Sequence, residues 1–189
     1  MRFRLVPLFG VLVAAACYLA AIWLYPGGYD WNRQYISTLL RGSPSPGRIP
    51  AVAGVFIFCV SIAFVFDRLA RAVGSSATSK AIRIGGIGSM VYSSLVVTPM
   101  HDLMVTISIP FFVVAILALL RVLYASREAG FLVTGTAVLA LLVVSVIIYY
   151  TGQFTSVLPW TQRSLFALFA AWLLTLDIGA PNLRLAQIA

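Results

Sequence analysis

Long stretches without charge constrain this chain more than any other feature. Leu5 to Tyr25 are 21 consecutive residues with no charged side chain. A helix of about 20 residues crosses the roughly 30 Å hydrocarbon core of a bilayer. Further apolar stretches follow along the chain. The sequence therefore predicts an all-α fold, a single integral membrane domain of six transmembrane helices, with spans at about 5–25, 49–66, 81–97, 102–124, 130–150 and 160–176.

The charge balance points to lipid as the partner. Only 10% of the 189 residues are charged and 61% are hydrophobic, whereas soluble domains have about 25% charged residues. The formal net charge is +8, but the thirteen Lys and Arg residues are scattered singly between apolar stretches. This scatter is typical of topology signals and contacts with anionic lipid. Membrane lipids are therefore the expected partners, and nucleic acid is not.

The start of the chain and its two cysteines have ordinary interpretations. Arg2 and Arg4 precede an apolar stretch, as in a signal peptide, but that stretch continues to Tyr25 and is too long for a signal core. An uncleaved first span is the better prediction. Cys17 and Cys59 lie within apolar stretches and have no neighbouring Cys or His. We expect them to pack in the bundle, and the sequence predicts neither a metal site nor a cofactor.

The segment from Tyr29 to Arg41 is too polar to cross a membrane. Its apolar residues Trp31, Tyr35 and Leu39 recur every four positions, and Asp30 is a suitable helix cap. The pattern predicts a short amphipathic helix that lies at the membrane surface or folds partly back into the bundle.

The distribution of cations predicts the orientation. With six spans, nine Lys and Arg residues fall on the side of the termini and four on the other side. The positive-inside rule then places both termini in the cytoplasm, with the protein in the cytoplasmic (inner) membrane. The nine are Arg2, Arg4, Arg68, Arg71, Lys80, Arg83, Arg121, Arg127 and Arg184, and the four are Arg33, Arg41, Arg48 and Arg163.

A candidate site follows from this orientation. The only histidine, His101, lies beside Asp102 in a short break between the third and fourth spans, on the same side as the amphipathic segment. Arg163 lies in the first turn of a span, where a cation is unfavourable, so Asp30 or Asp102 is its expected partner. The predicted ligand-binding residues in the outer leaflet are Asp30, Arg33, Ser37, His101, Asp102 and Arg163. Six solvated helix ends would give the same pattern.

Three functions remain open. The first is non-enzymatic: binding of a lipid or amphiphile, or a role as an accessory subunit of a membrane complex. For binding, Arg33 and Arg163 would hold an anionic headgroup that His101 and Asp102 orient. For a subunit, another chain would cover the small residues Gly85, Ser89 and Ser93. The second is a lipid-headgroup hydrolase or transferase with His101 as the base and Asp102 orienting it. The third is a small transporter.

Several of these residues also carry a family resemblance. The chain has Tyr25-Pro26 after span one, Ile36-Ser37-Thr38-Leu39, Pro99 followed closely by His101, and Arg163 opening a last span that contains Trp172. In these features it resembles the prokaryotic six-span membrane proteins called domain of unknown function 998. That family is similar, more distantly, to membrane proteins of the damage-regulated autophagy modulator and GPI-lipid-remodelling types. The resemblance implies a six-span architecture and a lipid ligand, but no catalytic residues. The sequence departs from the family at Thr38 to Arg41, where a glycine-containing end is expected.

Overall fold

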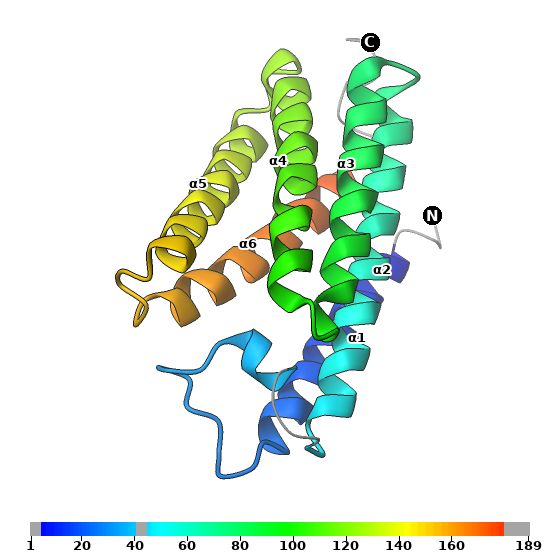
Figure 1. The fold of residues 1–189 in the computed structure, drawn as a ribbon. Helices are drawn as coiled ribbons and strands as arrows, with labels where there is room; N and C mark the ends of the chain where they lie inside the picture. The colour runs from blue at the N-terminus through cyan, green and yellow to red at the C-terminus, as the bar shows by residue number, and fades with distance from the viewer. Residues whose placement is uncertain (1–4, 41–44, 180–189) are drawn as a thin grey trace.

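The computed structural model describes residues 5–40 and 45–179, and these residues form an all-α fold without strands (Figure 1). The all-α prediction is confirmed. Predictions that concern Arg2, Arg4, Arg41 and Arg184 fall outside these residues. The helices are α1 (Leu5–Trp23), α2 (Arg48–Val73), α3 (Ala77–Ser94), α4 (His101–Ala125), α5 (Ala129–Thr151) and α6 (Leu158–Gly179), with two 3₁₀ helices, η2 (Ile36–Leu39) and η3 (Leu95–Val97).

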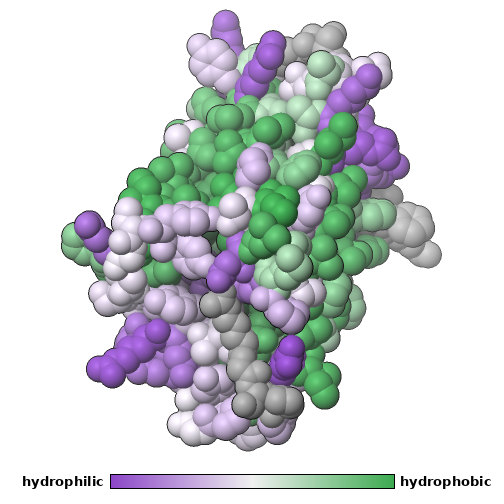
Figure 2. Space-filling view, viewed as in Figure 1, coloured by the Kyte–Doolittle hydropathy of each residue, from purple (hydrophilic) through white to green (hydrophobic). Residues whose placement is uncertain are grey.

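Four of the six helices are long and apolar enough to cross a membrane, namely α1, α2, α4 and α5. The other two carry charges near their ends, Lys80 and Arg83 in α3 and Arg163 and Asp177 in α6. Large apolar side chains are exposed on the surface, and Phe9 is 70% exposed. Figure 2 shows apolar side chains over the middle of one face and hydrophilic side chains mainly toward its two ends. These are features of a membrane-embedded protein.

The helices place the connections at two opposite ends (Figure 1). Helices α2, α3 and α4 lie side by side, α1 packs on α2, and α6 crosses obliquely behind α4 toward the tilted α5. We call one end the His101 end, which holds residues 24–40, 98–101 and 152–157. We call the other end the Asp67 end, which holds residues 67–77 and 125–129.

Small residues bring α3 into close contact with α4. A Cβ atom on Gly85 would lie 2.7 Å from the carbonyl oxygen of Phe111 and 3.0 Å from the amide nitrogen of Ala115. Ser89 is fully buried. The predicted close approach of a helix to this face is therefore confirmed. At Gly85, where the accessory-subunit alternative expected another chain, the neighbouring residues are Phe111 and Ala115 of α4 in the same chain.

A buried ion pair joins α2 to α6 at the Asp67 end. Nε of Arg68 lies 3.2 Å from Oδ1 of Asp177, whose side chain is only 2% exposed. On α2, Asp67 pairs with Arg71 and also with Arg83 of α3 (2.9 Å). The sequence predicted a loop that begins at 67 and a span that ends at 176. In the structure, α2 and α6 extend beyond these positions and contain the paired residues other than Arg83. The Arg68–Asp177 pair is largely buried, whereas Arg71 and Arg83 reach Asp67 from the surface.

The polar segment after α1 does not form the predicted amphipathic helix. Only η2 is helical, and residues 24–35 form turns and irregular backbone. The Asp30 carboxylate accepts a hydrogen bond from the N–H of Asn32 (2.8 Å), and the side-chain oxygen of Gln34 accepts one from the N–H of Asp30 (3.0 Å). Such local side-chain bonds to the backbone compete with helix formation. Asp30 therefore closes a turn and does not cap a helix.

Candidate functional site

A cavity of about 420 Å³ lies inside the bundle in the half nearer the His101 end. All six α-helices and η2 contribute to its walls, and Tyr18 is the one contribution of α1. Its volume lies in the range of about 300–1,000 Å³ that is usual for small-molecule sites. The sequence did not predict this cavity, because it depends on how helices distant in the sequence pack together.

One face of α4 and one face of α6 form much of the wall. The lining residues on each helix recur every three or four positions, which places them on a single helical face. Those on α4 are His101, Val105, Ser108, Ile109 and Phe112, and those on α6 are Leu158, Gln162, Leu165, Phe166 and Phe169. The same periodicity could have indicated these two faces from the sequence.

The lining is divided into a polar end and an apolar end. Phe112 and Phe169 lie deepest along their helices, and their ring centroids are 4.7 Å apart in an edge-to-face arrangement. His101, at the first residue of α4, is close to the opposite end. One end therefore suits hydrocarbon and the other offers hydrogen bonds.

The imidazole of His101 is held by the backbone. Its Nδ1 lies 2.7 Å from the carbonyl oxygen of Val96, so Nδ1 carries the hydrogen and donates it. In the neutral imidazole, this leaves the lone pair on Nε2. The Val96 carbonyl thus fixes the ring orientation, a role that the sequence analysis gave to Asp102. Within the described residues, no Ser, Thr or Cys forms a hydrogen bond with His101.

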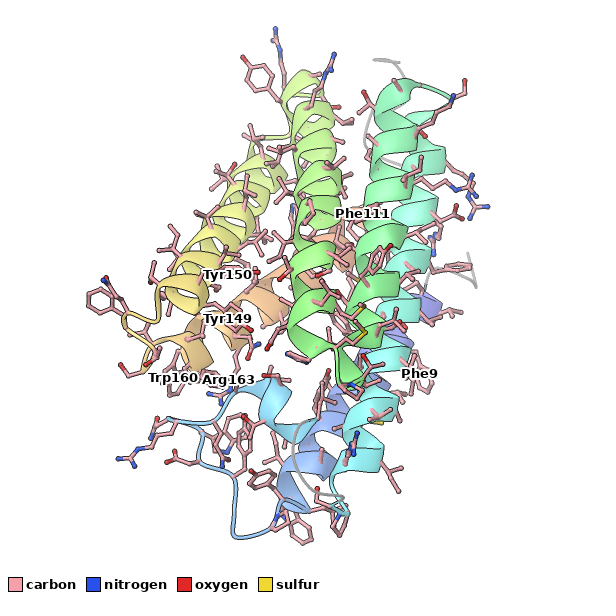
Figure 3. The ribbon with its side chains drawn as sticks, in the orientation of Figure 1. Phe9, Phe111, Tyr149, Tyr150, Trp160 and Arg163 are labelled. Atoms are coloured by element: carbon pink, nitrogen blue, oxygen red, sulfur yellow. The ribbon has the colours of Figure 1, made fainter. Side chains whose placement is uncertain are left out.

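Two tyrosines bridge α5 to α4 at the side of the cavity (Figure 3). The Tyr149 hydroxyl donates to Oδ1 of Asp102 at 2.6 Å, and the Tyr150 hydroxyl lies 2.6 Å from Oγ1 of Thr106. Both tyrosines also line the cavity. Asp102 is therefore engaged in joining the two helices, next to the cavity and not within its lining.

Arg163 does not pair with Asp30 or Asp102 as predicted. Its guanidinium donates to the carbonyl oxygens of Trp31 and Gln34 (2.6 Å for Gln34) and to the hydroxyl of Tyr29 (3.1 Å). The same group lies 5.0 Å from the Trp31 ring centroid and 5.6 Å from that of Trp160. Carbonyl dipoles and aromatic faces thus take the place of a carboxylate partner.

Two other predicted site residues lie apart from the cavity. Arg33 and Asp30 face each other at 3.9 Å, and the Arg33 side chain is 88% exposed. Ser37 of η2, by contrast, lines the cavity together with His101. The structure thus brings Ser37 and His101 to one cavity, with Asp102 and Arg163 beside it, and leaves Asp30 and Arg33 on the surface.

Ser145 is a site residue that the sequence analysis missed. Its Oγ is buried in the cavity wall and has no hydrogen-bond partner. Other helical serines donate to a carbonyl oxygen of the preceding turn: Ser61 to Ile57, four residues earlier, and Ser108 to Val105, three residues earlier. A single serine in the apolar stretch of α5 gave no signal in the sequence.

A second hollow adjoins the first on the outer side of His101. Its lining includes Arg48 and Asp102 as well as His101. One cation and one carboxylate thus face this hollow, which balances its formal charge. Among the described residues, no group of three or more His, Cys, Asp or Glu side chains is placed to hold a metal ion.

No protein family model, no curated protein and no solved structure matches the chain. What the structure itself defines is a class: a helical, membrane-embedded protein with several apolar spans and an internal cavity that is polar at one end.

Proposed function

We propose that this protein binds an amphiphile in the cavity between α3, α4, α5 and α6, and that it has no enzymatic activity of its own. One observation supports this most directly: a cavity of about 420 Å³ with apolar walls and hydrogen-bonding groups gathered at one end. An amphiphile has the same division into a hydrocarbon part and a polar part.

The size and the walls of the cavity suit an occupant. The cavity is partly open to the surface of the bundle, and its lining is mainly apolar. Apolar walls disfavour water as the occupant. A hydrocarbon chain from the surrounding membrane is the most available alternative.

The other functions have less support. A hydrolase or transferase would need a nucleophile or water placed by His101, and no described hydroxyl is hydrogen-bonded to this imidazole. An accessory subunit would use the small-residue face of α3 as its interface, but α4 of the same chain packs against that face at Gly85. No described feature favours the small transporter. The resemblance to domain of unknown function 998 proteins stays a prediction, and a lipid ligand agrees with it.

The proposal includes a membrane arrangement in which all six helices cross the bilayer. Helix α6 has 22 residues, a length of about 33 Å at 1.5 Å per residue, and its charges Arg163 and Asp177 lie near its ends, both with partners. Of the described Lys and Arg residues, six lie toward the Asp67 end and three toward the His101 end. This bias favours a cytoplasmic Asp67 end and an outer-leaflet position for the cavity, in the inner membrane.

A matched pair of variants on α4 tests the proposal. Val105→Phe places a ring in the cavity, whereas Val114→Phe makes the same change at an exposed position of the same helix. We expect native mass spectrometry of the wild-type protein, extracted in a mild detergent, to show a stoichiometric lipid that Val114→Phe retains and Val105→Phe loses. Equal retention by the two variants, or no specific lipid on the wild type, would contradict the proposal.

A further inference from the structure

We propose that the amphiphile is a neutral alcohol, an apolar molecule whose hydroxyl group binds at the polar end of the cavity with Ser145 as an anchor. This inference rests on the proposed function and names the chemical class of its ligand. It also replaces the anionic headgroup that the sequence analysis expected. Three observations support it: the charge of the lining, the direction of its hydrogen bonds, and the unpartnered hydroxyl of Ser145.

The cavity lining is uncharged. Among the described residues, no Lys, Arg, Asp or Glu lines it, and its polar members are hydroxyls, the Gln162 amide and His101. The two arginines expected to hold an anion are engaged elsewhere, Arg163 with the 29–34 backbone and Arg33 on the surface. Burying an anion without a cation is costly. A carboxylate or phosphate is therefore a poor match for this lining.

Several groups at the polar end present lone pairs. Ser108 donates its hydrogen to the carbonyl oxygen of Val105. Thr106, outside the lining, donates its own hydrogen to the Asp102 carbonyl, so Tyr150 is the donor in the Thr106–Tyr150 bond, and the hydroxyl oxygen of this lining residue keeps its lone pairs. His101 donates from Nδ1, which leaves Nε2 as an acceptor in the neutral ring. The lining also holds a donor, the amide NH₂ group of Gln162, whose oxygen accepts from the N–H of Ile36. An alcohol can both donate to the acceptors and accept from such a donor, whereas an ester or a ketone can only accept.

Ser145 supplies a second donor. Its Oγ is buried without a partner in the cavity wall, and a buried hydroxyl left in this state is unfavourable. A hydroxyl group is both donor and acceptor. A ligand alcohol can therefore accept from Ser145 and donate to a lone pair of the lining. Its hydrocarbon part then extends toward Phe112 and Phe169.

The test uses two photoreactive probes that differ only in the head. One is a long-chain fatty alcohol with a diazirine in the middle of its chain, and the other is the fatty acid with the same chain and diazirine. The full chain in nanodiscs is labelled with each probe, and the labelled residues are mapped by peptide mass spectrometry. We expect the alcohol to label cavity-lining residues of α4 and α5 at least about fivefold more than the acid, because the carboxylate of the acid would be buried in a lining without a cation.

Three variants define the outcome. Ser145→Ala should reduce labelling by the alcohol about fivefold, while Thr136→Val, which removes an exposed hydroxyl from the same helix, should leave it unchanged. Val105→Phe should abolish it. If the acid labels the cavity as well as the alcohol, and Val105→Phe blocks both, the alcohol inference is wrong while amphiphile binding stands. That result would indicate an anionic head near Arg48 in the adjoining hollow. If Val105→Phe blocks neither probe, the proposed function itself fails.

Discussion

Single residues at the two ends of the bundle show how burial changes the role of a charge. Asp30 and Arg33 face each other on the surface at 3.9 Å, whereas Asp177 is 2% exposed and lies 3.2 Å from Arg68. An exposed ion pair contributes at most about 1 kcal/mol. A buried pair that loses one partner costs about 3–5 kcal/mol, because the remaining charge stays in the interior.

We therefore predict that Asp177→Ala destabilises the protein by about 3–5 kcal/mol and Asp30→Ala by at most about 1 kcal/mol. Reversible unfolding in mixed micelles, followed by circular dichroism, measures both. The double variant Arg68→Met/Asp177→Leu is the control, since removing both charges should recover much of the loss. Equal effects of Asp177→Ala and Asp30→Ala would show that the buried pair has no special role.

Residue roles were the least predictable part of the site. His101 was correctly placed beside a turn, and His101 and Ser37 share the cavity. The partner of Arg163 was missed because the candidates considered were carboxylates, while the structure uses backbone carbonyls and aromatic rings about 130 positions away. Nothing in the order of the residues identifies such a partner. Ser145 was missed for a similar reason, since only the packing of the other helices makes its position a cavity wall.

The helices themselves were more predictable than the helices that they pack against, as α3 shows. A pattern of small residues such as Gly85 and Ser89 indicates that a helix can approach closely, but it does not say which helix. In the structure that helix is α4, the next along the chain. The segment after α1 was less predictable, because the helical spacing of Trp31, Tyr35 and Leu39 was overridden by hydrogen bonds that the side chains of Asp30 and Gln34 accept from the backbone.

At the scale of helices, we predict that a glycine-to-alanine substitution destabilises the protein at Gly85 in α3 and does not destabilise it at Gly130 in α5. Gly85→Ala forces a Cβ atom to within 2.7 Å of the Phe111 carbonyl oxygen, so α3 and α4 must separate, at a cost of about 1–3 kcal/mol. Gly130→Ala in the first turn of α5 meets no atom within 4 Å and should be neutral or stabilising by up to about 1 kcal/mol. Thermal unfolding in one detergent compares the two. A tolerated Gly85→Ala would mean that the α3–α4 contact is looser than described.

The whole molecule follows from the apolar stretches because a lipid-exposed chain must satisfy its backbone hydrogen bonds internally. Every predicted span has a helix in the structure, and α1, α2, α4 and α5 have the length and composition to cross the membrane. The cavity was not predictable, since it arises where one face each of α4, α5 and α6 meet. Its existence depends on tilts and crossings that no single apolar stretch encodes.

The proposed orientation leads to a labelling prediction. In a background with Cys17→Ala and Cys59→Ala, Asn32→Cys at the His101 end should react with a membrane-impermeant maleimide on intact cells. Ser75→Cys in the α2–α3 connection should react only after the cells are permeabilised. Both positions are exposed, so a difference reports their side of the membrane. The reverse pattern would invert the orientation and place the cavity in the inner leaflet.

The contacts of Arg163 also have a consequence for the time course of synthesis. The arginine that organises residues 29–34 is 132 positions after Trp31, whose carbonyl oxygen accepts its hydrogen bond. At about 5–20 residues per second, the ribosome needs roughly 7–26 s to cover that distance. During this interval the first connection has left the ribosome without the residue that shapes it. A nascent chain that stops before α6 therefore lacks the arginine that holds Tyr29 and Trp31.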